Sequence, residues 1–343
     1  MIRTWPFLLL ACAGIVPLAV AQEKPVLDDN FAMVATKQGL QRLYQAGRNW
    51  QENATCFSCH HQPLPMFAAI ESAKFGIPVE AKELKFQSDF THDYFQPRIE
   101  TMNAGKHVPG GSATAVFGLW AMMLNRRPPD ETTTAIVAYL LQVQGIAVAK
   151  AKIEGPWAPS CTRVPMNSKV GTTVLALIGM KHYATESQRK DVDKAATLAE
   201  TWLAKAPLDS TDDRFWRLWG LHLFAGNAAT IEEVRTALIA AQSKDGGWAQ
   251  TTKMTSDAYA TGQVLYVLRQ TGTRRDDAIA VRAASYLIRT QQADGSWRVE
   301  TRAKAVQPYF DNGDPYEKHQ FLSVAATSWA TAALAQMLPA AKR

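Results

Sequence analysis

The sequence predicts an all-α protein, a closed (α/α)6 toroid in which six outer helices surround six inner ones. Three observations support this prediction. Strand-like alternation of apolar and polar residues is almost absent, and apolar residues recur at helical spacing instead. Two kinds of helical segment take turns along the chain: amphipathic ones with charged faces, and ones rich in Ala, Gly, Ser and Thr. We expect the small-residue segments to crowd around an axis and the charged faces to lie outside.

Pairing each amphipathic segment with the small-residue segment after it divides the chain into six helical hairpins. An open superhelix of stacked hairpins is the rival arrangement. Closure is favoured because an open superhelix would expose the small-residue helices on one face. The predicted limits are 34–50 with 64–76, 80–103 with 112–125, 130–145 with 168–184, 188–206 with 212–226, 230–243 with 256–272, and 276–292 with 321–338.

The N-terminal sequence MIRTWPFLLLACAGIVPLAVAQEK combines Arg3, an apolar run and small residues before Gln22. This pattern is typical of a secretory signal peptide over residues 1–21. An uncleaved anchor and a lipoprotein attached at Cys12 are the alternatives. We expect residues 22–343 to form a single toroid domain, exported to the periplasm, monomeric and without a membrane span.

Charge and cysteine content limit the classes of partner and scaffold. The formal net charge is only +6, and no Lys/Arg run indicates a nucleic-acid partner. Without the signal peptide only three cysteines remain, Cys56, Cys59 and Cys161. An odd number this low argues against a disulfide scaffold and directs attention to the closely spaced pair.

Three junctions between helices share a Gln…Gly…Trp motif. The complete copy is RAASYLIRTQQADGSW at 282–297, and AQSKDGGW at 241–248 repeats its second half. A third copy with a longer loop contains Gln144, Gly155 and Trp157. The glutamine can bond backbone groups left open at a helix end, and the tryptophan can cover them.

This motif resembles the Gln-Trp repeat of squalene and hopene cyclases, and the chain is similar to the squalene cyclase and prenyltransferase repeat group. The stretch QPYFDNGDPYEKHQFLSVAATSWATAALA also resembles exported bacterial members of unsettled function. The resemblance implies a terpenoid cyclase-like toroid whose central cavity takes an isoprenoid or lipid. Protonating cyclases carry Asp-any-Asp-Asp, but the run Asp209-Ser210-Thr211-Asp212-Asp213 has Ser210 at the first required position. The run is interpreted as a helix N-cap, and isoprenoid protonation is not expected.

A haem-attachment signature lies in the first outer-to-inner loop, at 53–66. NATCFSCHHQ places Cys56 and Cys59 three positions apart with His60 directly after them. In c-type haem the two thiols bond the vinyl groups and the imidazole binds iron. One alternative is a zinc site made from Cys56, Cys59, His60 or His61, with Cys161 as a further ligand. The other is a disulfide between Cys56 and Cys59. We expect this loop at the mouth of the central cavity.

The sequence does not decide which residue would be the second axial ligand of such a haem. His107 and His319 lie in loops of the two hairpins that would flank the first one, and each is also readable as an ordinary loop histidine. Three methionines in loops of this face are further candidates: Met66, Met166 and Met254.

Six aromatic residues at helical spacing either line the cavity or form ordinary core: Trp120, Trp216, Trp219, Tyr259, Tyr266 and Trp329.

Two functions remain open at the level of sequence. The first is an exported protein with covalent haem c that transfers electrons to a redox partner or acts on a small ligand. The second is a haem-free enzyme or binder that holds a small apolar ligand in the cavity. The sequence shows no acid dyad, nucleophile triad or phosphate loop that selects a reaction.

Overall fold

The computed structural model describes residues 27–145, 155–159, 163–224, 226–303 and 311–340. The predicted signal peptide, its Cys12 and the third mature cysteine, Cys161, lie outside these ranges. In the described part of the chain no helix combines the length and the apolarity needed to cross a bilayer.

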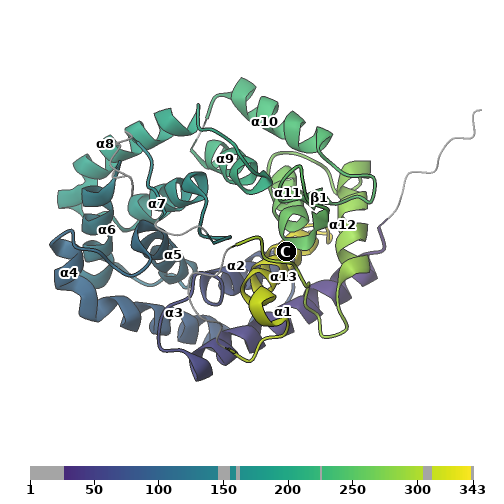
Figure 1. The fold of residues 1–343 in the computed structure, drawn as a ribbon, viewed down its shortest axis with the longest axis horizontal. Coiled ribbons are helices and arrows are strands. Elements are labelled where there is room, and N and C mark those ends of the chain that lie inside the picture. Colours follow the sequence, from purple (N-terminus) through teal and green to yellow (C-terminus); the bar gives the residue numbers. More distant parts are fainter. Residues whose placement is uncertain (1–26, 146–154, 160–162, 225, 304–310, 341–343) are drawn as a thin grey trace, which may run out of the picture.

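Two concentric rings of helices make up the fold (Figure 1). The outer helices are α1 (Asp29–Asn53), α3 (Ala81–Phe95), α6 (Glu131–Val143), α8 (Glu186–Leu203), α10 (Ala228–Ala240) and α12 (Ala278–Thr290). The inner helices are α2 (Pro63–Ala73), α5 (Gly111–Leu124), α7 (Lys169–Tyr183), α9 (Thr211–Leu223), α11 (Ala258–Gln270) and α13 (Gln320–Ala335). Short segments complete the chain: η1 (Gln96–Arg98) and α4 (Ile99–Asn103) after α3, η2 (Glu317–His319) before α13, and the antiparallel pair β1 (Trp248–Ala249) and β2 (Ser256–Asp257).

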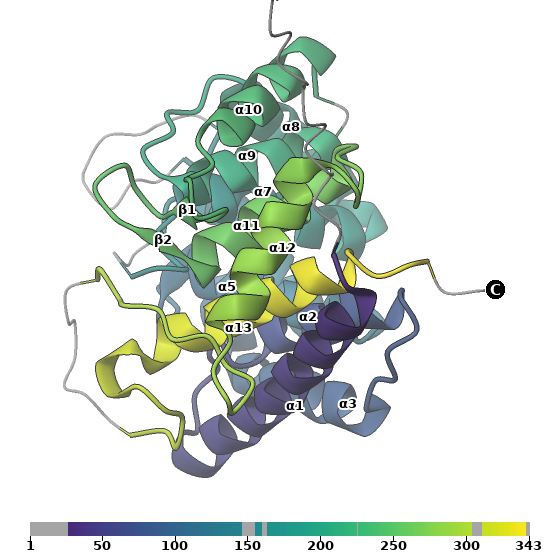
Figure 2. The ribbon, with the colours of Figure 1, turned by 90° about the vertical axis from the view of Figure 1, so that its right-hand side faces the viewer.

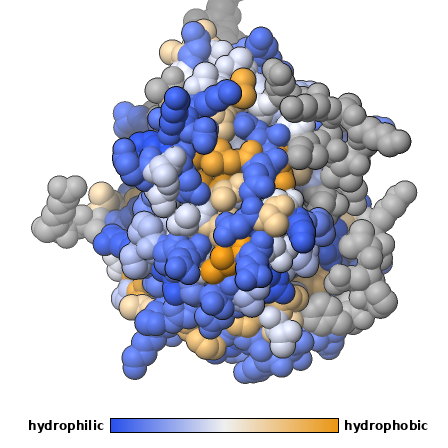
Figure 3. Space-filling view, turned by 90° about the vertical axis from the view of Figure 1, so that its left-hand side faces the viewer, coloured by the Kyte–Doolittle hydropathy of each residue, from blue (hydrophilic) through white to orange (hydrophobic). Residues whose placement is uncertain are grey.

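All six predicted hairpins are present, and the ring is closed. The last inner helix, α13, packs against α11 on one side and against both helices of the first hairpin, α1 and α2, on the other (Figure 2). The open superhelix is therefore excluded. The polar residues that cover most of the described surface around α4, α6 and α8 agree with outward-facing charged sides (Figure 3).

The inner helices need small residues because their backbones approach one another closely. A Cβ added to Gly262 of α11 would lie 2.6 Å from the backbone nitrogen of Ala330 in α13. At such a distance only glycine allows the contact. Gly118 of α5 is likewise covered by the ring of Phe95 in α3. The small-residue pattern that predicted the inner ring thus has a direct steric cause.

Aromatic side chains fill the axis of the inner ring. The ring of Phe67 from α2 lies 5.1–5.7 Å from the rings of four buried residues on four other inner helices: Trp120, Trp219, Tyr266 and Trp329. Edge-to-face and tilted contacts at this distance are favourable. These side chains are packed core at this depth, which is the more ordinary of the two interpretations open from sequence. We call this cluster the aromatic plug.

The Gln…Gly…Trp motif forms the same joint in all three copies. Each glutamine Nε2 donates to the carbonyl of its own loop glycine and to a backbone carbonyl of the next outer helix in the ring. The distances are 2.8–3.0 Å: Gln144 to Gly155 and Ala195, Gln242 to Gly246 and Ile279, and Gln291 to Gly295 and Ala35. Each tryptophan donates its indole N–H to a carbonyl of the preceding outer helix: Trp157 to Leu140, Trp248 to Leu238 and Trp297 to Leu287. The copy with the expanded loop is therefore a true third copy.

The glycine of each joint has no room for a side chain. Gly295 adopts φ +84°, and a Cβ there would lie 2.5 Å from the carbonyl oxygen of Gln38 in α1. Gly155 and Gly246 meet α8 and α12 in the same way. The joint thus presses the loop backbone against the neighbouring outer helix. In the last copy that helix is α1, so Gln291 ties the end of the ring to its beginning.

We predict that Gln291→Ala lowers the free energy of unfolding by about 1–3 kcal/mol, because it leaves two carbonyl groups without their donor at a partly buried position. Urea unfolding followed by circular dichroism measures this. The neighbouring exposed Gln292, which bonds only Thr290 of its own turn, provides the control variant Gln292→Ala. Equal losses for both variants would contradict the role of the joint.

Candidate functional site

The outer-to-inner loops meet at one end of the ring, which we call the loop end. Figure 2 shows the β1–β2 turn and the loop before α13 at this same end. The cysteine loop belongs here too, because it joins α1 to α2. Pro63 begins α2, where the missing N–H of proline costs no helical hydrogen bond.

The cysteine loop presents its residues in different ways. Cys56 is exposed, whereas Cys59 is only 2% exposed. His60 is 8% exposed, yet neither of its ring nitrogens has a hydrogen-bond partner among the described residues. Its ring packs against Phe321 of α13 at 5.0 Å and Trp50 of α1 at 6.0 Å. Burial, together with the charges of His61 and Arg163, holds the pKa of His60 well below its usual range.

These properties fit a covalent haem. An iron ligand must be a neutral imidazole with an available nitrogen, and buried polar atoms without partners are rare in folded proteins. His60 satisfies both conditions, and the side chains of Cys56 and Cys59 lie just before it in the chain. Within the described residues, no group of three or more His, Cys, Asp and Glu side chains converges to hold a metal ion.

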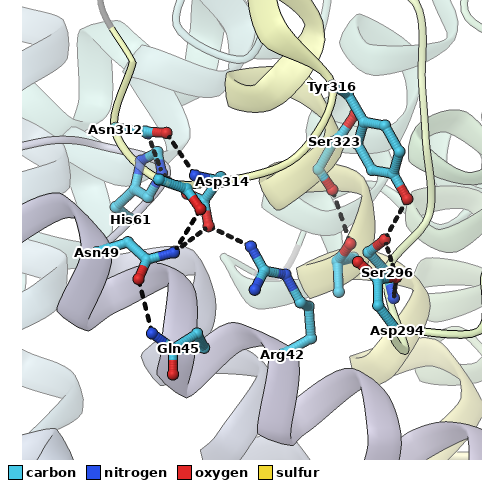
Figure 4. A network of polar contacts seen from close by, with 12 residues as sticks. Arg42, Gln45, Asn49, His61, Asp294, Ser296, Asn312, Asp314, Tyr316 and Ser323 are labelled. Carbon is cyan, nitrogen blue, oxygen red and sulfur yellow. Dashed lines mark hydrogen bonds and ion pairs between the residues drawn. The ribbon is translucent and has the colours of Figure 1, made fainter.

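His61, the next residue, is in a different state. It is fully buried, and its Nε2 lies 2.7 Å from Oδ2 of Asp314 (Figure 4). Its Nδ1 lies 3.2 Å from Oγ of Ser58. Both nitrogens are therefore engaged within the protein. The zinc alternative that counts His61 as a ligand would have to break these contacts.

The two histidines considered as second iron ligands lie in different environments. His107 is exposed in the loop before α5. His319 ends η2 and accepts a hydrogen bond at Nδ1 from the backbone N–H of Thr301, at 3.0 Å. Partial burial, with the charges of Arg298 and Lys318, lowers the pKa of His319. The choice between the two stays a prediction.

A second buried polar group lies at the start of α9. Ser210 is the N-cap of this helix, as predicted: its hydroxyl accepts from the backbone N–H of Asp213 at 3.1 Å. Asp212, however, takes no part in the cap. Its carboxyl is buried with 2% exposure, and Oδ1 accepts hydrogen bonds of 2.6 Å from the Tyr259 hydroxyl and the Gln263 amide. Its Oδ2 has no hydrogen-bond partner in the part of the chain that the structure describes.

The environment of Asp212 favours its protonated form. Burial, with the charge of Asp213, raises the pKa of Asp212 to about 6, although the bonds from Tyr259 and Gln263 oppose the shift. Trp216, one turn further along α9, also has an unpartnered Nε1, and so does Oε1 of Gln263. These three buried polar atoms near the loop end therefore have no hydrogen-bond partner among the described residues.

Sequence reasoning missed Asp212 because it treated the whole run 209–213 as a cap. A signal was present. Asp212, Trp216 and Trp219 are spaced i, i+4 and i+7, so they share one face of α9, and Trp219 belongs to the aromatic plug. This face points to the axis and carries Asp212 with it.

Asp257, at the start of α11, is a second carboxyl with a raised pKa. It caps the helix by accepting from the backbone N–H of Ala260 and also accepts from the Gln250 amide, at 2.9 and 2.8 Å. Burial raises its pKa to about 6. Arg302 donates to Gln250 at 3.0 Å, and its charge lowers the pKa of both Asp212 and Asp257. The two carboxyls thus share one nearby cation.

The fold has known counterparts. No protein-family model and no curated protein matches the chain. Among solved structures, a glycosidase aligns over 92% of this chain and all of its own, with a TM-score of 0.59 and 11% identity. The type II terpene cyclase MstE from Scytonema aligns over 91% of this chain and all of its own, with a TM-score of 0.53 and 14% identity. Its variant with geranylgeranyl dihydroxybenzoate aligns at 0.53 and 15%, over 90% and 99% of the two chains. At these identities the likeness shows the fold alone.

We predict that Asp212 makes the protein lose stability as pH rises. The pKa of Asp212 is about 6 in the folded state against 3.8 for the ordinary group, so the folded state binds the proton more tightly than the unfolded state. The resulting stabilisation is fully present below pH 3.8 and is lost as pH rises through about 6. Relative to Asp212→Asn, the wild type should lose on the order of 2–3 kcal/mol between pH 4 and pH 7.5. Urea unfolding at the two pH values measures this.

The exposed Asp209, outside the cap, provides the charge-removal control Asp209→Asn. This variant should follow the wild type across the same pH range. A parallel pH dependence for the wild type and Asp212→Asn would contradict a raised pKa at Asp212.

Proposed function

We propose that the protein is an enzyme that protonates an apolar, isoprenoid-like ligand at the loop end of the ring, with Asp212 as the acid. The observation that carries this is the state of one carboxyl group. Tyr259 and Gln263 hold its Oδ1, while its Oδ2 is buried, unpartnered and the atom left to carry the proton. A general acid works best when its pKa lies near the working pH, and the pKa of Asp212 is about 6.

The reaction balances without a further reactant. The proton on Oδ2 passes to a carbon of a ligand double bond, the π electron pair forms the new C–H bond, and the ligand becomes a carbocation. Asp212 becomes a carboxylate that still accepts from Tyr259 and Gln263. The cation then loses a proton to close the reaction, and Asp212 regains its proton from water.

The surroundings suit a ligand of this kind. Asp212 lies in the first turn of α9, whereas Trp219 of the aromatic plug lies two turns deeper, so the ligand would sit on the loop side of the plug. Aromatic faces attract a cation, and Trp216 and Phe215 flank this position along α9. The MstE structure that aligns with this fold was determined with geranylgeranyl dihydroxybenzoate, an isoprenoid-bearing substrate of that cyclase.

We predict that the mature protein transfers deuterium from D2O onto a carbon of geranylgeranyl dihydroxybenzoate, and that Asp212→Asn reduces the rate at least a hundredfold because the acid is lost. Product mass spectrometry measures the transfer. Asp209→Asn, which changes an exposed carboxyl just before the cap, is the matched control and should stay close to wild type. The proposal is wrong if the wild type neither binds this substrate nor transfers deuterium to it. It is also wrong if Asp212→Asn reacts at the wild-type rate.

A second candidate function rests on a separate observation: the two unpartnered nitrogens of buried His60. Cys56 and Cys59 would hold a haem through thioethers, and His60 would supply a neutral nitrogen to its iron. Such a group supplies one-electron transfer to a redox partner. Export, which the N-terminal sequence predicts, is in keeping with this chemistry.

We predict that the protein, exported together with a cytochrome c maturation system, carries a Soret band that survives acid-acetone extraction. The change of both Cys56 and Cys59 to alanine should abolish it, because both thioethers are lost. Cys161→Ala removes the third mature cysteine and should leave the band intact. Wild-type protein without covalent haem would exclude this second function and leave the first one untouched.

A further inference from the structure

His61 and His60 are neighbours in sequence but have opposite environments. Nε2 of His61 lies 2.7 Å from Oδ2 of Asp314 and 3.0 Å from Nδ2 of Asn312, and Nδ1 lies 3.2 Å from Oγ of Ser58. Both nitrogens of His61 are thereby used. Within the described ranges His60, by contrast, has no hydrogen-bond partner on either nitrogen.

Asp314, whose carboxylate contacts His61, is itself bonded by two side chains of α1. Arg42 of α1 lies 2.5 Å from Oδ1 of Asp314 and offsets its charge. Asn49, two turns along α1, donates to the same oxygen at 3.1 Å and to the carbonyl of Gly313 at 3.0 Å. Figure 4 shows Arg42 and Asn49 reaching Asp314 from one helix, with His61 on the other side. A buried carboxylate with this many donors keeps its position.

Trp50 extends the same fixation to the first cysteine. Its ring stacks on that of His61, with centroids 4.7 Å apart and an interplanar angle of 29°. Its indole N–H donates to the carbonyl of Cys56 at 2.7 Å. The loop from Cys56 to His61 is therefore held near both of its ends, through Trp50 and through Asp314.

We infer that the His61–Asp314 pair is a latch that positions the cysteine loop, so that Cys59 and His60 face inward and Cys56 stays exposed. The two residues are 253 apart in the chain and meet because the ring closes between its sixth and first hairpins. The latch engages His61 and leaves His60 as the imidazole of this loop that is open to a ligand. The functional role of the latch rests on the haem proposed above. The presence of the latch in the fold does not depend on that proposal.

The test is thiol labelling of the reduced, haem-free mature chain, with peptide mapping to separate Cys56 from Cys59 and Cys161. In wild type, exposed Cys56 should react quickly and Cys59 slowly. Asp314→Ala should speed the labelling of Cys59 by about tenfold or more and leave Cys56 within about twofold, because the loop opens locally. Asp314→Asn, which keeps an acceptor oxygen for His61, should restore most of the protection.

Tyr316→Phe is the matched control. Tyr316 lies two residues beyond Asp314 and anchors the same loop through a 2.7 Å hydrogen bond to Ser296, away from the cysteines. It should leave Cys59 slow. If Asp314→Ala does not fold, His61→Gln tests the same contact by changing the other residue of the pair. Unchanged Cys59 labelling in whichever of these two variants folds, or equal acceleration by Tyr316→Phe, overturns the latch.

A second arm separates the latch from the haem proposal. With the cytochrome c maturation system present, Asp314→Ala should lower the fraction of chains that carry covalent haem at least threefold, whereas Tyr316→Phe should match wild type. If wild type carries no haem, the haem proposal fails while the labelling result still decides the latch. If wild type carries haem and Asp314→Ala carries as much, the latch does not position the site.

Discussion

The joint made by a glutamine, a glycine and a tryptophan is the constraint on which this ring depends. An outer helix ends in a loop, and the glutamine at that point satisfies the loop carbonyl and a carbonyl of the next outer helix together. Three pairs of neighbouring hairpins are thereby coupled through backbone groups. Since the last joint runs from α12 to α1, the same device that spaces neighbouring hairpins also closes the circle.

Closure determines which loop residues can meet. The segment 311–316 comes from the sixth hairpin and the cysteine loop from the first, so their contact exists only in a closed ring. The two candidate chemical groups also belong to facing parts of the ring. His60 precedes α2 and Asp212 begins α9, and the plug shows that these inner helices reach each other across the axis, with Phe67 and Trp219 5.7 Å apart.

Much of this architecture could be predicted from sequence, because it depends on repeating local signals. Helical periodicity, small residues on alternate helices and the Gln…Gly…Trp spacing predicted all six hairpins and the third joint. The site was less accessible. The partners of Asp212 lie 47 and 51 residues away, and the partner of His61 lies 253 residues away. No local sequence pattern distinguishes His60 from His61. They differ because ring closure brings the carboxylate of Asp314 to His61.

The two ends of the described chain pack into one small apolar cluster. Leu27, just before α1, contacts the cluster that contains Leu338, just after α13, together with Leu40 and Ile77. Linear stacks of helical hairpins need specialised end units to shield their outermost faces, but a circle has no outermost unit. The break between these termini is thus one position among six where the chain passes from an inner to an outer helix. A circular permutant that bridges these termini and starts at another such position would retain every contact of the ring.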